Sequence, residues 1–182
     1  MIDPDLALRE AVAEATELAD DPSWKVAFAG AVPGPAILVH DRSRRGKRDY
    51  FIVDFRIGER STARMIVNAT TGVIDEVMGI EEEGDALSGF IPESVVLSRI
   101  PAQIVLDDGR VFQRPAGAPT IEVVWEHSRE SQTRFEPFYW VRWPSGELYV
   151  RVDGSIFLEL TRPGLPRLEN GGDSTDKRRP RG

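Results

Sequence analysis

Apolar residues recur at the spacing of a helix close to the start of the chain. Asp3 and Pro4 open this stretch, and such a pair is typical of a helix start because Asp accepts hydrogen bonds from free backbone amides. Pro22 disfavours helical geometry at the residue before it, so the helix should end shortly before that position. The pattern predicts a helix over residues 4–19. Its apolar side, which is rich in alanine, consists of Leu8, Ala11, Val12, Ala15 and Leu18.

The pattern then changes to short apolar runs, which are typical of strands. Residues 24–31 are apolar and partly alternating, and residues 36–40 resume the same character after a break at Pro33-Gly34-Pro35. The sequence therefore predicts a strand in each run.

Strict alternation of apolar and polar residues begins at residue 50. Residues 50–57 form the clearest case, and residues 61–67 and 73–80 continue it after two turns. Gly72, in the second turn, is available for a positive φ. We therefore predict three antiparallel strands. The alternating apolar residues of the first strand, which should share one face, are Phe51, Val53, Phe55 and Ile57.

A second group of elements follows the charged break at residues 81–85. Residues 92–100 predict a short helix with Pro92 in its first turn, and Asp107-Asp108-Gly109 predicts a hairpin turn. Residues 121–125 are rich in residues that favour strands. A second antiparallel meander should follow, with strands at 138–143, 147–152 and 155–160.

These elements predict an α+β fold in which the N-terminal helix packs on an antiparallel sheet and a second antiparallel β-meander follows. Residues 1–85 would form the first unit. Residues 86–162 would form a second β-rich unit, either separate from the first or continuous with it. Residues 163–182 contain few apolar side chains, so they predict a disordered tail.

The turn before the third strand of the first unit reads Asn68-Ala69-Thr70-Thr71-Gly72-Val73-Ile74. With its flanking strands, over residues 50–80, it resembles the PepSY family of small α+β modules, whose strands close on an Asp-x-x-Thr-Gly-x-apolar turn. Asn68 stands where that family usually has Asp, and Asn can make the same local bonds to backbone amides. The resemblance implies a non-catalytic binding or inhibitory module, and it transfers no catalytic residue to this chain.

Composition narrows the classes of function. The 182 residues include no cysteine, which excludes disulfides, thiolate metal sites and a cysteine nucleophile. The N-terminus lacks a basic start followed by an apolar core, and no apolar run is long enough to span a membrane, so we predict a cytoplasmic protein without a membrane partner. The net charge of −7 argues against nucleic acid as the main partner, because phosphate contacts need a basic face. The abundance of Arg, Ala, Gly and Pro suggests a bacterial genome rich in G and C.

The histidines and serines give no catalytic signature. His40 and His127 each follow a strand-like run, and we expect both in solvent at the end of a strand. Ser128 and Ser131 lie near His127, but no Gly-x-Ser-x-Gly turn is present, and adjacent residues of a strand point to opposite faces. The acidic run at 81–85 lacks the ligand spacing of a calcium loop. We therefore predict no catalytic residue, no metal site and no cofactor.

Two carboxylates inside the predicted strands allow two interpretations. Asp54 and Asp75 should lie on a solvated sheet face, where Arg56 or Arg64 would pair with a carboxylate. Alternatively, a carboxylate in a sheet-lined pocket could act as a general base. This second interpretation requires Asp54, Asp75 or His40 to line a cavity between the helix and a curved sheet.

An aromatic cluster is the candidate binding site. On a strand over 138–143, Phe138 and Trp140 would point to one face, and Tyr139, Val141 and Trp143 would point to the other. One face should belong to the core, and the other could be exposed near arginines, which is the composition of an interface hot spot. The alternative is that both faces are covered. The candidate binding residues are Phe138, Tyr139, Trp140, Arg142, Trp143 and Arg151.

We therefore predict a non-catalytic module that binds or inhibits a protein or peptide partner, in the manner of an immunity protein. Binding would use an exposed strand edge or the surface of residues 138–143. The alternative is a small-ligand-binding protein or an enzyme with the cavity described above. Self-association and membership of a larger assembly, with the basic stretch at 177–181 as a docking segment, also stay open.

Overall fold

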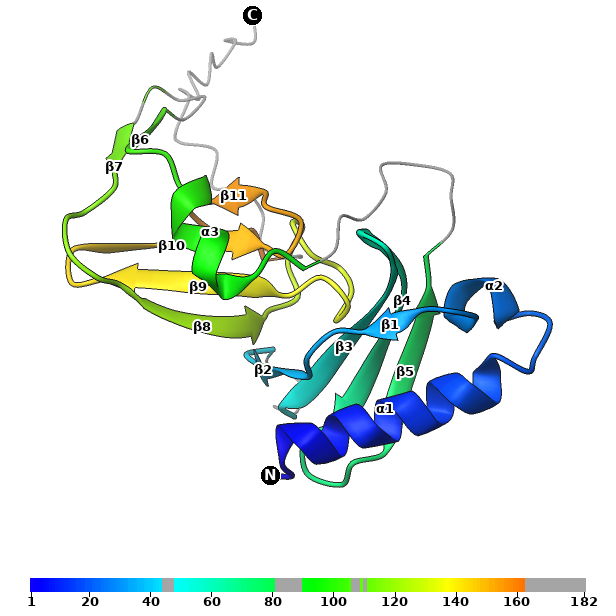
Figure 1. Cartoon of the computed structure of the whole chain (residues 1–182). Coiled ribbons are helices and arrows are strands. Elements are labelled where there is room, and N and C mark those ends of the chain that lie inside the picture. Colours follow the sequence, from blue (N-terminus) through cyan, green and yellow to red (C-terminus); the bar gives the residue numbers. More distant parts are fainter. Residues whose placement is uncertain (44–47, 81–89, 106–108, 110, 163–182) are drawn as a thin grey trace, which may run out of the picture.

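The computed structural model describes residues 1–43, 48–80, 90–105, 109 and 111–162. Helices and strands alternate irregularly along the described chain, and most strands join one large mixed sheet (Figure 1). The protein is therefore an α+β protein, as predicted. The predicted charged break at 81–85, the central residues of the predicted turn at 107–108 and the predicted tail at 163–182 lie outside the described residues.

Within the described residues, the large sheet has nine strands, eight of which follow one another in the order β11-β10-β9-β8-β2-β3-β4-β5. The ninth strand, β1, pairs with the end of β3, and β6 pairs with β7 in a small separate sheet. The strands are β1 (Val32–Pro33), β2 (Ile37–Asp41), β3 (Tyr50–Ile57), β4 (Arg60–Asn68), β5 (Ile74–Gly79), β6 (Gln103–Val105), β7 (Val111–Gln113), β8 (Thr120–Trp125), β9 (Phe138–Trp143), β10 (Gly146–Arg151) and β11 (Ile156–Phe157).

One parallel strand pair makes the large sheet continuous. β2 and β8 run parallel, with His40 opposite Val124 and Asp41 opposite Trp125. The backbone amide of Arg42 extends the pair by donating to the carbonyl of Trp125 at 2.8 Å. The other strand pairs of the sheet are antiparallel. The sheet therefore crosses the predicted unit boundary between residues 85 and 86.

The first helix, α1 (Pro4–Leu18), begins where the sequence predicts. The side chain of its N-cap residue Asp3 accepts a hydrogen bond from the amide of Asp5 at 2.8 Å. Its alanine side is buried against β3 and β4, and Figure 1 shows the helix crossing these strands. We call this cluster the α1 core. Its buried members are Ala7, Ala11, Ala15, Phe28, Phe51, Val53, Phe55, Ala63, Met65, Val67 and Ala69.

The opposite face of β3 and β4 belongs to a second cluster, which also includes Val96 of the short helix α3 (Glu93–Arg99). We call it the central core. It unites the two predicted units because it combines residues before position 67 with residues after position 89. Its buried members are Val39, Tyr50, Ile52, Ile66, Phe90, Ile91, Val96, Ile100, Val123, Phe135, Tyr139, Val141, Trp143, Leu148, Val150 and Val152.

The predicted strand at residues 24–31 is wrong. The chain forms a short helix there, α2 (Lys25–Phe28), after the side chain of Asp21 accepts a hydrogen bond from the amide of Ser23 at 2.8 Å. The rings of Trp24 and Phe28 lie 5.9 Å apart on one side of this turn, whereas Val26 is 87% exposed. A helical turn places residues four apart on the same side, so Phe28 is buried in the α1 core and Trp24 packs against it.

Candidate functional site

The face of β8, β9 and β10 that points away from the central core carries an aromatic stack flanked by arginines. Trp140 in β9 lies opposite Tyr149 in β10, and their rings are stacked, with 6.4 Å between centroids and 6° between planes. The guanidinium carbons of Arg42 and Arg142 lie 4.0 Å and 3.9 Å from the centre of the Trp140 ring. We call these four residues the Trp140 surface. Each guanidinium is attracted to the negative face of the indole ring, which holds the group together.

Two carboxylates border the Trp140 surface. Trp140 donates its indole N–H to Glu147 at 3.0 Å, and Arg142 forms an ion pair with Glu122. Burial raises the pKa of Tyr149, and Glu147 adds to this effect, whereas Arg42 opposes it. The surface therefore combines positive, negative and aromatic groups rather than forming a purely basic site.

Both arginines of the Trp140 surface keep an unused hydrogen-bond donor. Among the described residues, no acceptor reaches the buried Nη1 atom of Arg42 or the buried Nε atom of Arg142. A buried donor without a partner costs about 1–3 kcal/mol. A small movement of either guanidinium toward an acceptor on another molecule would recover part of this cost.

Within the described chain, no helix packs on this part of the sheet. α1 lies on the same face but covers β3 and β4, at the other end of the sheet. α3 contributes Val96 to the central core, on the opposite face. Phe157 and Leu160 pack beside the stack together with the buried residues Val124, Phe138 and Tyr149. Trp140, Arg42 and Arg142 therefore stay partly accessible while the base of the stack is buried.

The structure separates the six candidate binding residues. Trp140 and Arg142 belong to the Trp140 surface. Phe138 is fully buried beneath that surface, and Tyr139 and Trp143 point to the opposite face, in the central core. The alternation predicted for 138–143 is confirmed, but the buried face contributes no accessible group.

Arg151, the sixth candidate, is held by the chain itself. Its guanidinium binds Asp153 at 2.5 Å and donates to the backbone carbonyl of Glu130 at 2.7 Å. This hydrogen bond with Asp153 raises the pKa of Arg151. The pKa of Asp153 is lowered because the hydrogen bonds from Arg151 and Ser155 outweigh its burial. Arg151 therefore fastens a turn to the sheet.

Two members of the Trp140 surface were not predicted from the sequence. Tyr149 lies opposite Trp140 because the predicted strands at 138–143 and 147–152 pair across a short connection, and counting outward from that connection would have found the pair. Arg42 follows β2, which reaches β9 only through the β2–β8 pair. No local pattern in the sequence predicts that Arg42 lies next to Trp140.

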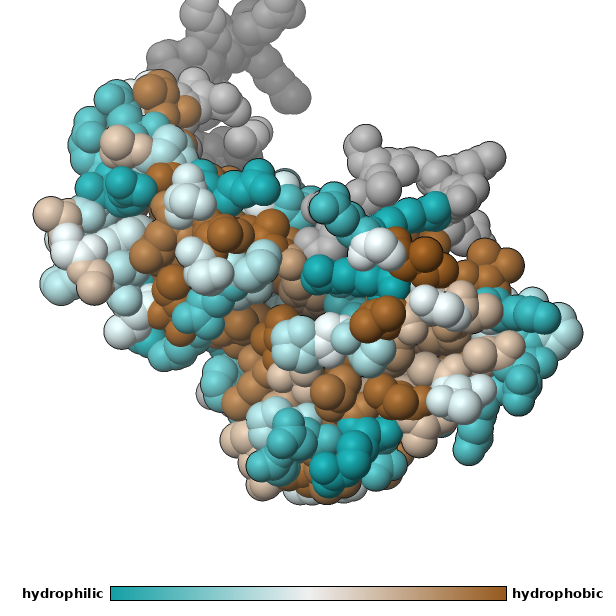
Figure 2. Space-filling view, viewed as in Figure 1, coloured by the Kyte–Doolittle hydropathy of each residue, from teal (hydrophilic) through white to brown (hydrophobic). Residues whose placement is uncertain are grey.

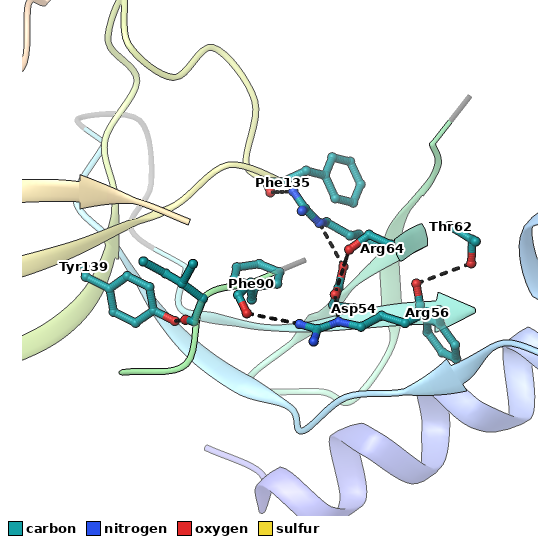
Figure 3. A network of polar contacts seen from close by, with 10 residues as sticks. Asp54, Arg56, Thr62, Arg64, Phe90, Phe135 and Tyr139 are labelled. Atoms are coloured by element: carbon teal, nitrogen blue, oxygen red, sulfur yellow. Dashed lines mark hydrogen bonds and ion pairs between the residues drawn. The ribbon is translucent and has the colours of Figure 1, made fainter. Parts of the chain in front are cut away.

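Asp54 lies inside the protein rather than on a solvated sheet face, so that prediction is wrong. The residue is 3% exposed, and Figure 3 shows Arg56 and Arg64 both reaching its carboxylate. The distances are 2.5 Å from Arg56 and 3.1 Å from Arg64, and the hydroxyl of Ser61 donates to the same carboxylate at 2.7 Å. The predicted pairing with these arginines is therefore confirmed in a buried setting.

The Asp54 network connects the first strands to the second half of the chain. Arg56 donates to the backbone carbonyl of Phe90 at 3.2 Å, and Arg64 donates to that of Phe135 at 2.9 Å (Figure 3). Asp54 holds both guanidiniums in position for these bonds. The arrangement is that of a structural fastening between β3–β4 and the segments packed over them.

The other candidate chemical groups do not meet Asp54. Asp75, on β5, lies 3.7 Å from the guanidinium of Arg134, which pairs more closely with Glu76 at 2.7 Å. His40 shares a hydrogen bond of 2.9 Å with Asp49 and is 43% exposed in its side chain. Asp54, Asp75 and His40 therefore do not line one common cavity.

His127 is exposed, as expected for a strand end. Ser128 and Ser131 are buried, and the amide of Ser131 donates to the hydroxyl of Ser128 at 3.1 Å, so the two serines stabilise a turn. In the part of the chain that the structure describes, no three His, Asp or Glu residues are grouped so that they could hold a metal ion. None of its helices has both the length and the apolar character to cross a membrane.

A groove of about 610 Å³ runs between α1 and the edge strand β5. One wall is formed by α1, and the other by Thr71, Gly72 and the start of β5. Asp75 is the one candidate carboxylate of the sequence that lines it. The full lining consists of Leu6, Glu10, Ala13, Glu14, Glu17, Thr71, Gly72, Val73, Ile74, Asp75, Glu76 and Val77.

No known protein-family model, curated protein or solved structure matches this chain. The resemblance of residues 50–80 to PepSY modules therefore stays a prediction.

Proposed function

We propose that this protein is a non-catalytic binding or inhibitory module that docks a partner protein on the Trp140 surface. The observation that carries the proposal is the stacked pair of Trp140 and Tyr149, with Arg42 and Arg142 against the indole ring, on a part of the sheet that no helix among the described residues covers. In this proposal the N-terminal helix and its antiparallel sheet form the scaffold, and the second meander presents the docking face.

The composition of the Trp140 surface supports docking of a protein. Trp, Tyr and Arg are the residues that most often dominate the binding energy of protein interfaces. The base of the stack is buried, so its side chains lose little conformational freedom when a partner covers them. The free donors of Arg42 and Arg142 would find acceptors on the partner.

The resemblance of residues 50–80 to PepSY modules supports the same class, because it implies binding or inhibition without catalysis. Partner capture in the manner of an immunity protein is consistent with a small, cysteine-free, acidic chain. The resemblance concerns the scaffold, whereas the Trp140 surface lies in the second meander.

Affinity capture from the host organism tests this proposal. The tagged full chain and its Trp140→Ala and Arg142→Ala variants serve as baits, and the captured proteins are identified and their affinities measured. Truncation of a dominant interface residue costs about 2 kcal/mol or more, so we expect a loss of about thirtyfold or more for Trp140→Ala.

Trp24→Ala is the matched control, because Trp24 is another half-buried tryptophan but packs with the α1 core. Circular dichroism and denaturant unfolding establish that each bait is folded. A partner retained by the control and lost by Trp140→Ala supports the proposal. Equal capture by all folded variants contradicts it.

A further inference from the structure

The groove between α1 and β5 is a second feature with the form of a binding site, at the opposite end of the sheet from the Trp140 surface. We propose that it binds an extended, lysine- or arginine-bearing segment of a partner polypeptide, which adds to the free edge of β5 as a further strand. This proposal rests on β5, α1 and the groove, and does not depend on the Trp140 surface.

The edge of β5 supplies unpaired backbone groups. β5 ends the strand order of the large sheet, and among the described residues only β4 pairs with it. Along an edge strand, every second residue directs its N–H and C=O groups away from the sheet, where they can pair with an added strand. Such an addition satisfies main-chain groups for many side-chain sequences, so the groove walls must provide the specificity.

The groove walls offer apolar contact at their base. Leu6, Ile74 and Val77 are half-buried there, and Val73 is 62% exposed beside them. Covering these side chains removes apolar surface from water, which favours binding. The groove can therefore hold the stem of a long side chain as well as its charged end.

The charge on the α1 wall sets the chemistry of the partner. Glu10, Glu14 and Glu17 project from α1 into the groove, and none of them has an ion-pair partner among the described residues. Asp75 also lines the groove, but its carboxylate lies 3.7 Å from the guanidinium of Arg134, so the glutamates of α1 supply the uncompensated charge. Figure 2 shows hydrophilic residues gathered at the lower edge of the half that α1 crosses. A segment with lysine or arginine at alternate positions complements this wall.

These glutamates also destabilise α1. Glu10 and Glu14 are like charges one turn apart, and such pairs destabilise a helix. Glu17 lies in the last turn, which contains no basic residue, so its charge opposes the helix dipole. A bound cationic segment would offset both the repulsion between Glu10 and Glu14 and the unfavourable position of Glu17. Ligand binding therefore explains why these glutamates are present, whereas helix stability does not.

Fluorescence anisotropy with labelled peptides and the full-length protein tests this inference. The first probe is a ten-residue peptide that alternates Lys and Thr, the second alternates Glu and Thr, and the third repeats the Lys–Thr sequence with N-methyl groups on every second amide. N-methylation removes backbone donors and keeps the charge. We expect saturable binding of the first probe and a loss of about tenfold or more for the other two.

Protein variants distinguish the groove from the overall negative charge. Glu10→Gln, Glu14→Gln and Glu17→Gln together should weaken the Lys–Thr peptide by about tenfold or more. Asp20→Asn, Glu59→Gln and Glu93→Gln together remove the same charge from exposed positions outside the groove, and should weaken it by about threefold or less.

Three results would overturn the inference. Equal binding of the N-methylated peptide means attraction by charge without strand addition. Equal losses in the two triple variants mean that the groove has no special role. Self-association of the protein that disappears in the groove variant means that a second copy of this chain, rather than a basic partner, occupies β5. Trp140→Ala should leave peptide binding unchanged, so failure here is distinct from failure at the Trp140 surface.

Discussion

Asp54 and Arg64 face each other across β3 and β4 and are joined by an ion pair of 3.1 Å inside the protein. The side chain of Arg64 is fully buried, and that of Asp54 is 4% exposed. A buried guanidinium is tolerated where carboxylates and carbonyls compensate its charge and fill its hydrogen bonds. Asp54 meets this need for Arg64 and, at the same time, orients Arg56.

Loss of the Asp54 carboxylate should therefore destabilise the protein strongly. We expect Asp54→Ala to lower the free energy of unfolding by about 3–5 kcal/mol, because it removes the negative charge beside a buried guanidinium. Urea denaturation followed by circular dichroism measures the change. Asp75→Asn is the control, since its ion pair is longer and partly exposed and should contribute less than about 1 kcal/mol. A cost for Asp54→Ala as small as that of the control would contradict this account.

The three tyrosines should make the protein sensitive to alkali. Burial raises the pKa of Tyr139 to about 12, where Glu93 adds to the effect and Arg56 opposes it, and burial also raises the pKa values of Tyr50 and Tyr149. A tyrosine in an unfolded chain has a pKa near 10. As the pH rises above about 10, the unfolded chain releases protons that the folded protein retains, so stability falls with rising pH.

For Tyr139 this linkage amounts to about 2–3 kcal/mol lost between about pH 10 and 12. Ultraviolet absorbance of tyrosinate and parallel denaturant unfolding over this range measure ionisation and stability. Tyr139→Phe removes the hydrogen bond of 2.5 Å to the carbonyl of Ile91, and should also shrink the alkaline loss of stability. Ionisation of Tyr139 near pH 10 in the folded protein would show that its hydroxyl is not buried, and would contradict this prediction.

Gly72 should resist substitution because its φ is +78°. An L-residue pays about 1–2 kcal/mol in this left-handed region. The space beside Gly72 is sufficient, since an added Cβ would lie 3.6 Å from the Cδ1 atom of Ile2, so backbone conformation alone sets the cost. We expect Gly72→Ala to lower the thermal midpoint, measured by calorimetry. Gly146→Ala, where φ is not positive and the nearest contact is 3.5 Å, should have a smaller effect.

Trp140 and Trp143 should have opposite roles despite their closeness in sequence. Trp143 is 6% exposed in the central core, and its replacement by Ala leaves a large cavity, so we expect a loss of about 3–5 kcal/mol. Trp140 is half-buried, and Trp140→Ala should cost less than half as much while removing partner capture. Chemical denaturation of both variants gives the comparison. Similar stability losses would show that both faces of β9 belong to the core.

Local patterns predicted the individual strands well. The boundaries of β3 and β9 agree with the predicted ranges, because their side chains alternate and a tight turn follows each strand. The helix over 92–100 and the first helix are likewise confirmed. Each of these elements is defined by residues close together in the chain, so a sequence contains sufficient information about it.

The two errors have physical causes that the sequence partly reveals. Asp21 and Ser23 begin a helical turn, and the spacing of Trp24 and Phe28 fits that turn as well as it fits a strand. Asp54 was assigned to a solvated face although its neighbours on that face, Tyr50 and Ile52, are apolar. Apolar residues that share a strand face with a charged residue indicate that this face is covered as well.

The composition of the Trp140 surface depended on information that local patterns do not contain. Trp140 and Arg142 were predicted because they lie together in an aromatic run. Arg42 joins them only because β2 pairs with β8, and no turn or short connection sets that pairing. Asp75 likewise lines the α1–β5 groove because α1 packs beside β5, and the sequence of β5 alone does not predict that packing.

The β2–β8 pair also bears on how a nascent chain acquires this structure. β3, β4 and β5 can pair as soon as they leave the ribosome, because short turns connect them. β2 gains its partner on the other side only after β8 has been synthesised. During translation, the open edge of β2 is a site at which two unfinished chains can join wrongly, so prompt completion of the second half protects the first from aggregation.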